Sequence, residues 1–460
     1  MNPNAASLRN SLIIALLMGL IPFSAPGAER TEAVESRRHF DASDIDRLKI
    51  YDDDPENIWN QVFRLFFIRN SASDGTLYGF DELDPLLWPK SDYFLPGGAD
   101  YKLAHLTLEQ FLKKYDPERP ISHVKRALMQ RDLWAVYDWV AKNGDAHPRE
   151  SHKLKILIAR AIAALALSRE QIENLPDNYG DTWAALATHE SRSSFDSGDP
   201  NEVDLPYDLT SPDGEWVALW NDYEVANVTP VHASHFSARS QFWVLIRLPE
   251  GREATLEYLN QLKNPWGIQK RSELRKASAF RPKLAQFPVN TEVALVRQMV
   301  LIDDQGELVP SPLIEMVQLR RFLTDPSDRK AEGPRSTFIE FRMSHQQLGM
   351  GTGPGLVRVP EGDIEYPIFE THANDPFRIR EVATPYAITP EPIYGRCTLC
   401  HSGRGIMSLQ SRGSYIPTRP KFPAIKAEDI SFDPVRVTSH QKRGQYDWGM
   451  LKGMIEVSGE

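Results

Sequence analysis

The chain of 460 residues is poor in cysteine, in basic runs and in long apolar runs. Its two cysteines, Cys397 and Cys400, lie three residues apart, which excludes a disulfide framework linking distant segments. Lys and Arg number 53 against 63 Asp and Glu, a formal net charge of −10. Because nucleic acids and anionic membranes attract basic surfaces, this acidic chain is a poor match to either. A nucleophile elbow and a solenoid repeat are also absent from the sequence.

Residues 1–28 are typical of a secretory signal peptide. Arg9 supplies a positive charge, SLIIALLMGLIPF is apolar, and SAPGA offers small residues for cleavage. The apolar stretch is shorter than the roughly 20 residues that span a bilayer. We therefore expect cleavage after Gly27 or Ala28, export to the periplasm or beyond, and no integral membrane span in the mature chain. An uncleaved N-terminal anchor is the alternative.

The first half of the remaining chain has helical periodicity. Residues 29–54 are polar and acidic, which predicts a surface lead-in, and residues 55–189 predict an all-α domain. Ser168 followed by Gln171 predicts a capping box that opens a short helix. Two apolar stripes flank the break at NGDAHP; the first comprises Ile121, Val124, Leu128, Leu133, Val136, Trp139 and Val140, and the second Leu154, Leu157, Ile158, Ala161, Ile162 and Leu165.

The residue pattern changes from helical to strand-like after a linker or long loop at 190–213 that is rich in Ser, Asp, Gly and Pro. Residues 214–374 predict a mainly antiparallel α+β domain, with a hairpin connection at 303–307 and one helix over REATLEYLNQL. Residues 375–460 are rich in proline around the cysteines and predict a terminal helix over SHQKRGQYDWGMLKGMIE. The predicted fold class is multidomain α+β. The expected strands are GEWVALW, QFWVLIRL, TEVALVRQMVLID, LIEMVQLRRF and STFIEFRMS.

The stretch YGRCTLCHSGRG, residues 394–405, carries the clearest chemical signal. Two thiols three residues apart on one helical turn match the separation of the two haem vinyl groups, and the next histidine is carried under the iron. Over Cys397, Cys400 and His401 the sequence resembles the c-type cytochromes. The resemblance implies one covalently attached haem c, with His401 as the proximal iron ligand, and attachment outside the cytoplasm.

Two other readings of the cysteine pair stay open. A redox disulfide between Cys397 and Cys400 is typical of a thioredoxin-like βαβ context, whereas the flanks here are proline loops. A zinc site needs a fourth ligand, for which His372 and His440 are the candidates. Since prolines precede the motif, the first helix of a small cytochrome domain is missing or very short, and we expect the haem segment to pack against the α+β domain.

Neighbouring residues are candidates for the rest of the haem site. Met450, Met454 and His440 are candidates for the sixth iron ligand, and Arg396 and Arg404 for contacts with the propionates. Methionine ligation raises the reduction potential and a second histidine lowers it, while an open position permits ligand binding.

We expect an exported mono-haem protein that transfers single electrons to a redox partner with a basic docking surface. The first alternative is a haem enzyme of peroxidase-like chemistry, an oxidoreductase, or a haem-based sensor, each with an open sixth position. The second alternative is a binding or scaffold protein with an accessory haem. No motif identifies catalytic residues.

Overall fold

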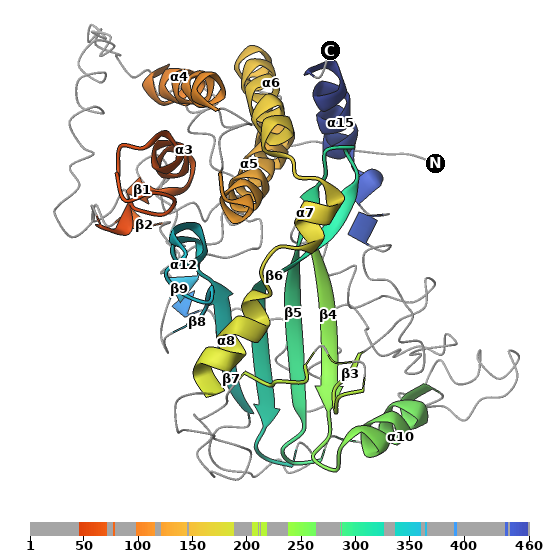
Figure 1. Ribbon diagram of the computed structural model, residues 1–460. Helices are drawn as coiled ribbons and strands as arrows, with labels where there is room; N and C mark the ends of the chain where they lie inside the picture. Colours follow the sequence, from red (N-terminus) through yellow and green to blue (C-terminus); the bar gives the residue numbers. More distant parts are fainter. Residues whose placement is uncertain are drawn as a thin grey trace, which may run out of the picture. The chain divides into compact units, whose positions relative to one another are not determined.

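The computed structural model shows a mixed α+β protein, which confirms the predicted class at that level (Figure 1). All described residues belong to one compact unit, 42–460. The described residues are 46–70, 77–78, 98–115, 121–144, 147–187, 205–209, 211, 213–218, 238–263, 286, 288–325, 336–359, 364–365, 391–392, 438–439 and 442–458.

Over its described residues the region 55–189 is mainly helical, but it is not all-α as predicted, because it also holds a short pair of strands. The break at NGDAHP separates two long helices, and the second begins at Pro148, where a missing N–H costs no helical hydrogen bond. The helices are α3 (Ile58–Phe67), α4 (Gly98–Lys114), α5 (His123–Asn143), α6 (Pro148–Leu165), α7 (Arg169–Glu173) and α8 (Asn178–Ala187). A short antiparallel pair, β1 (Arg69–Asn70) and β2 (Leu77–Tyr78), lies within the same part of the chain.

The capping box at the start of α7 is confirmed. The backbone N–H of Gln171 donates to Ser168 Oγ at 3.2 Å, and the backbone N–H of Ser168 donates to Gln171 Oε1 at 3.0 Å. Two N–H groups that have no partner inside the helix are thereby satisfied, which fixes where this five-residue helix begins.

Helix α5 differs from the amphipathic helix that its sequence predicts. Leu128, Leu133, Val136 and Val140 of its predicted apolar stripe are buried, while Val124 and Trp139 are half-buried. Polar residues on the other sides are buried as well, among them Gln130, Arg131, Asp132 and Asp138. The helix packs against α6, α12 (His345–Met350), α15 (Tyr446–Ser458) and the sheet, so neighbours surround it. The prediction of one apolar stripe was therefore incomplete, because polar residues of α5 are buried through specific partners.

The predicted antiparallel sheet has six strands in the order β3-β4-β5-β6-β7-β8. The turn at 303–307 joins β5 to β6 as predicted, with Gly306 at φ 74° and Asp303 Oδ1 accepting the N–H groups of Gln305 and Glu307. Of the predicted strand GEWVALW, the structure describes two strand residues. The strands are β3 (Val217–Ala218), β4 (Ser240–Arg247), β5 (Glu292–Ile302), β6 (Leu308–Phe322), β7 (Ser336–Met343) and β8 (Leu356–Arg358).

Helices pack on this sheet and at its ends. Helices α7 and α8 contact β6 (Figure 1), and α10 (Arg252–Lys263), the predicted helix between strands, contacts β3 and β4. Helix α15 begins at Tyr446, several residues later than the sequence predicted, and packs on α6 and α5. A separate pair, β9 (Ile364–Glu365) with β10 (Glu391–Pro392), precedes the cysteine segment in the chain.

Candidate functional site

The residues of the predicted haem attachment lie outside the described residues. They are Arg396, Cys397, Cys400, His401, Arg404 and the candidate ligand His440. Strand β10 ends at Pro392, five positions before Cys397, and description resumes at Thr438. The covalent haem, its proximal histidine and its propionate contacts therefore stay predictions from the sequence.

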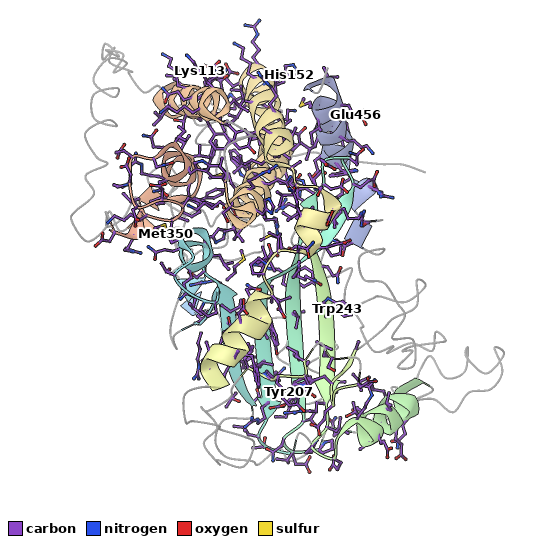
Figure 2. All side chains as sticks on the ribbon, viewed as in Figure 1. Lys113, His152, Tyr207, Trp243, Met350 and Glu456 are labelled. Carbon is purple, nitrogen blue, oxygen red and sulfur yellow. The ribbon has the colours of Figure 1, made fainter. Side chains whose placement is uncertain are left out.

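The two methionines proposed as sixth ligands are described, and both belong to α15. The Tyr137 hydroxyl on α5 lies 3.5 Å from Met454 Sδ, and Lys155 Nζ on α6 lies 3.9 Å from Met450 Sδ. Both sulfurs thus contact the helix pair on which α15 packs. Glu456, labelled in Figure 2, marks the last turns of the same helix.

Four charged side chains from three separate parts of the chain meet at the start of α15. We call Asp138, Arg239, Lys442 and Asp447 the Lys442 cluster. Lys442 Nζ donates to Asp138 Oδ2 at 2.6 Å and to Asp447 Oδ2 at 2.9 Å, and Arg239 Nη1 donates to the same Asp138 oxygen. Gln445 Oε1 accepts a third bond from Lys442 at 3.2 Å, and the ammonium lies 5.3 Å from the centroid of the Trp134 ring.

The Lys442 cluster is withdrawn from water. The exposed fraction is 0% for Lys442, 1% for Asp138, 4% for Arg239 and 6% for Asp447. Burying a charge is costly unless it is paired and hydrogen-bonded, and here two cations face two carboxylates. The two cations compensate the buried negative charge, most of all that of Asp138, which both of them contact.

The two carboxylates of the cluster differ in pKa. Burial opposes ionisation of Asp138, but the Lys442 ammonium and the Arg239 guanidinium outweigh it and lower its pKa to about 2. Burial raises the pKa of Asp447, and the neighbouring Asp138 carboxylate raises it further against the opposing effect of Lys442. Asp138 is thus the carboxylate that the cations stabilise, while ionised Asp447 is the less favoured partner.

A second buried group joins α5 to two other segments. Tyr51 donates its hydroxyl to Asp132 Oδ2 at 3.1 Å, and His345 Nε2 lies 3.1 Å from Asp132 Oδ1. Tyr51 and Asp132 have exposed fractions of 0% and 1%. Asp132 thereby connects residue 51, α5 and α12 through one carboxylate.

The neighbouring residue Arg131 ties α5 to the sheet. Its Nη2 donates to Ser240 Oγ at 2.8 Å and lies 3.0 Å from Glu315 Oε1, and Arg297 Nε lies 3.2 Å from Glu315 Oε2. These residues hold the middle of α5 against β4, β5 and β6. Neither this group nor the Lys442 cluster was identified from the sequence, because each combines residues that are far apart in the chain.

The described residues were also searched for metal ligands and for membrane-spanning helices. Within them, no three His, Cys, Asp or Glu side chains come together as ligands for a metal ion. None of the described helices is long and apolar enough to cross a membrane. Comparison of the chain with protein-family models, with curated proteins and with solved structures finds no match.

Proposed function

We propose that the chain is an exported c-type cytochrome-like protein that carries one haem c and transfers single electrons. The observation that carries this proposal is the run Cys397-Thr398-Leu399-Cys400-His401, which contains both cysteines of the chain. The apolar N-terminal segment supports it independently, because c-type haem is attached outside the cytoplasm in the family that the motif resembles. Export to the periplasm is part of the proposal.

Each residue of the motif has a separate role in the proposal. The Cys397 and Cys400 thiols form thioethers with the haem vinyl groups, and the His401 imidazole binds the iron from the proximal side. Arg396 and Arg404 bind the propionates through charge-assisted hydrogen bonds. The haem supplies a reversible one-electron change at its iron. Met450, Met454 and His440 are the candidates for the distal ligand.

The rest of the proposal concerns organisation and partners. We assign residues 55–189 to a helical domain, 214–374 to an α+β domain and 375–460 to a haem-binding segment. With a formal net charge of −10, the protein suits a redox partner that presents a basic docking surface.

The test is expression of the full chain together with a haem-attachment system. After denaturation, haem should stay with the polypeptide in the wild type and be lost when Cys397 and Cys400 are both replaced by Ser. Loss of all haem from the denatured wild type would overturn covalent attachment. His401→Ala should keep the thioethers and change the absorption spectrum, which separates attachment from iron ligation.

Spectra with carbon monoxide then distinguish electron transfer from the alternatives. A six-coordinate iron that does not bind carbon monoxide supports one-electron transfer. Rapid binding to the reduced protein identifies an open or displaceable sixth position and supports the haem enzyme or sensor instead.

A further inference from the structure

The end of the chain forms a strap on the helical part of the protein. We define the C-terminal strap as residues 438–439 and 442–458, which include α15. Trp448 lies against Trp134 of α5, with ring centroids 5.8 Å apart, and Leu451 has an exposed fraction of 0%. The strap therefore packs through apolar side chains along α5 and α6.

Apolar packing alone does not fix the position of a helix along its neighbours, because apolar contacts have no preferred direction. The Lys442 cluster adds hydrogen bonds and ion pairs, which do have one. Lys442 precedes α15, and its ammonium makes three hydrogen bonds while it is fully buried. A displacement of the strap by one residue would leave this charge buried without Asp138. Since an uncompensated buried charge is strongly destabilising, the docked position is the one that pairs Lys442.

The cluster also joins parts of the chain that are far apart. Asp138 comes from α5 and Arg239 from the residue before β4, while Lys442 and Asp447 belong to the strap. Among the residues that the structure describes, Lys142 and Tyr137 of α5 and Tyr446 of the strap are further titratable groups beside it. Asp138 is shared by both cations, so it is the central residue of the cluster.

The surface contacts of the same segment are of a different kind. Arg443 pairs with Glu307 at 2.6 Å, but the two side chains are 58% and 42% exposed. An exposed ion pair is screened by water and contributes little. Arg443 therefore provides a matched control, next in sequence to Lys442 but outside the buried cluster.

We propose that the Lys442 cluster is a latch that holds the C-terminal strap in register on α5 and α6, with Asp138 as its central residue. The strap follows the cysteine segment in the chain, so the latch fixes the downstream end of the segment that carries the haem. This last consequence rests on the proposed function, whereas the latch itself does not. Asp138 and Lys442 would thus act on the haem only indirectly, through the position of the strap.

Hydrogen exchange of the full-length protein tests the latch directly. In Asp138→Asn and in Lys442→Met, backbone amides of residues 446–458 should exchange about a hundredfold faster or more, the effect of breaking a buried ion pair. In Arg443→Ala the change should stay below about threefold. Exchange in β5 and β6 should be unchanged in Lys442→Met, which shows that the rest of the protein stays folded.

The double variant tests whether the two residues act through each other. Asp138→Asn with Lys442→Met removes one charge of each sign and leaves Arg239 with Asp447. The increase in α15 exchange over wild type should be well below the product of the increases in the two single variants. The reason is that each single variant already breaks the same ion pair, so the double variant loses it only once. Strap exchange that is equal in wild type and both single variants, or single effects that simply multiply, would overturn the latch.

Haem measurements on the same variants separate the latch from the proposed function. Haem should stay covalently attached in every variant, since Cys397 and Cys400 are intact, while carbon monoxide should bind reduced Lys442→Met faster than wild type or Arg443→Ala. Unchanged carbon monoxide binding despite a loosened strap would overturn the positioning role. A wild type without haem would contradict the proposed function, and the exchange rates would still decide the latch.

Discussion

The side-chain amide of Gln130 on α5 pairs with the backbone of Ile302, the last residue of β5. Gln130 Nε2 donates to the Ile302 carbonyl at 2.8 Å, and Gln130 Oε1 accepts the Ile302 N–H at 3.0 Å. The side chain thus takes the place that a neighbouring strand would occupy, and both residues are buried. This contact joins a helix and a strand that are 172 residues apart in the sequence.

Replacing Gln130 should therefore cost more than its own hydrogen bonds. In Gln130→Ala, the buried N–H and C=O of Ile302 lose their partners, and we expect the free energy of unfolding to fall by about 2–4 kcal/mol. Urea denaturation measures the change. Gln305→Ala is the control: its side chain is exposed in the β5–β6 turn and bonds only Asp304 among the described contacts, so a change below about 0.5 kcal/mol is expected.

The lowered pKa of Asp138 predicts how the free energy of unfolding changes in acid. Its folded pKa of about 2 lies below the ordinary value of 3.8, so its ionised form stabilises the folded state. This stabilisation, about 2 kcal/mol, is fully present above the ordinary pKa and is lost as pH falls toward 2. The difference in unfolding free energy between wild type and Asp138→Asn should be constant from pH 7 to about 5 and shrink below about 4. A difference independent of pH would contradict the assignment.

Asp447 should behave in the opposite way. Its pKa is raised in the folded protein, so the folded state favours the protonated form and ionisation costs stability at neutral pH. Asp447→Asn should therefore be neutral or stabilising at pH 7, with an advantage that disappears as pH falls through the raised pKa to the ordinary one. Urea denaturation of Asp447→Asn and Asp138→Asn at a series of pH values measures the direction in which each substitution changes the free energy of unfolding. Strong destabilisation by Asp447→Asn at pH 7 would refute the asymmetry.

Replacing each of two helical glycines by alanine should change the stability of the protein in opposite directions. A Cβ at Gly349 in α12 would lie 2.4 Å from the backbone oxygen of Ile50, so Gly349→Ala should cost about 1–3 kcal/mol. A Cβ at Gly453 in α15 would meet no atom within 4 Å, so Gly453→Ala should gain up to about 1 kcal/mol from helix propensity. Thermal unfolding of both variants checks the pair, and equal shifts would contradict the close approach at Gly349.

The capping box of α7 gives a further matched comparison. Ser168→Ala removes the acceptor for the Gln171 N–H and should cost about 1 kcal/mol. Ser122 stands at the N-cap of α5 without a side-chain capping bond, so Ser122→Ala should cost only a few tenths of that amount. Urea denaturation of both variants measures the difference. Equal losses would show that the Ser168 bond does not stabilise the helix.

Local patterns predicted local structure well. The break before Pro148, the capping box at Ser168 and the turn at 303–307 each depend on a few consecutive residues, and each is confirmed. The predicted terminal helix is interrupted: Lys442 and Arg443 are helical, but a break at Gly444 and Gln445 separates them from α15, and glycine is a poor helix former. The surroundings of α5 were also missed, since an apolar stripe does not show that the opposite face is covered.

The sequence by itself determined the mixed α+β composition and the proposed chemistry of Cys397, Cys400 and His401, because periodicity, turns and motif spacing involve residues that are close in the chain. Only the tertiary structure decided which polar side chains are buried together. Arg239 and Lys442 look in the sequence like ordinary solvated charges, and nothing near either of them indicates Asp138 as a partner. The physical reason is that a buried charge is compensated through space, by whichever groups the fold brings within hydrogen-bond distance.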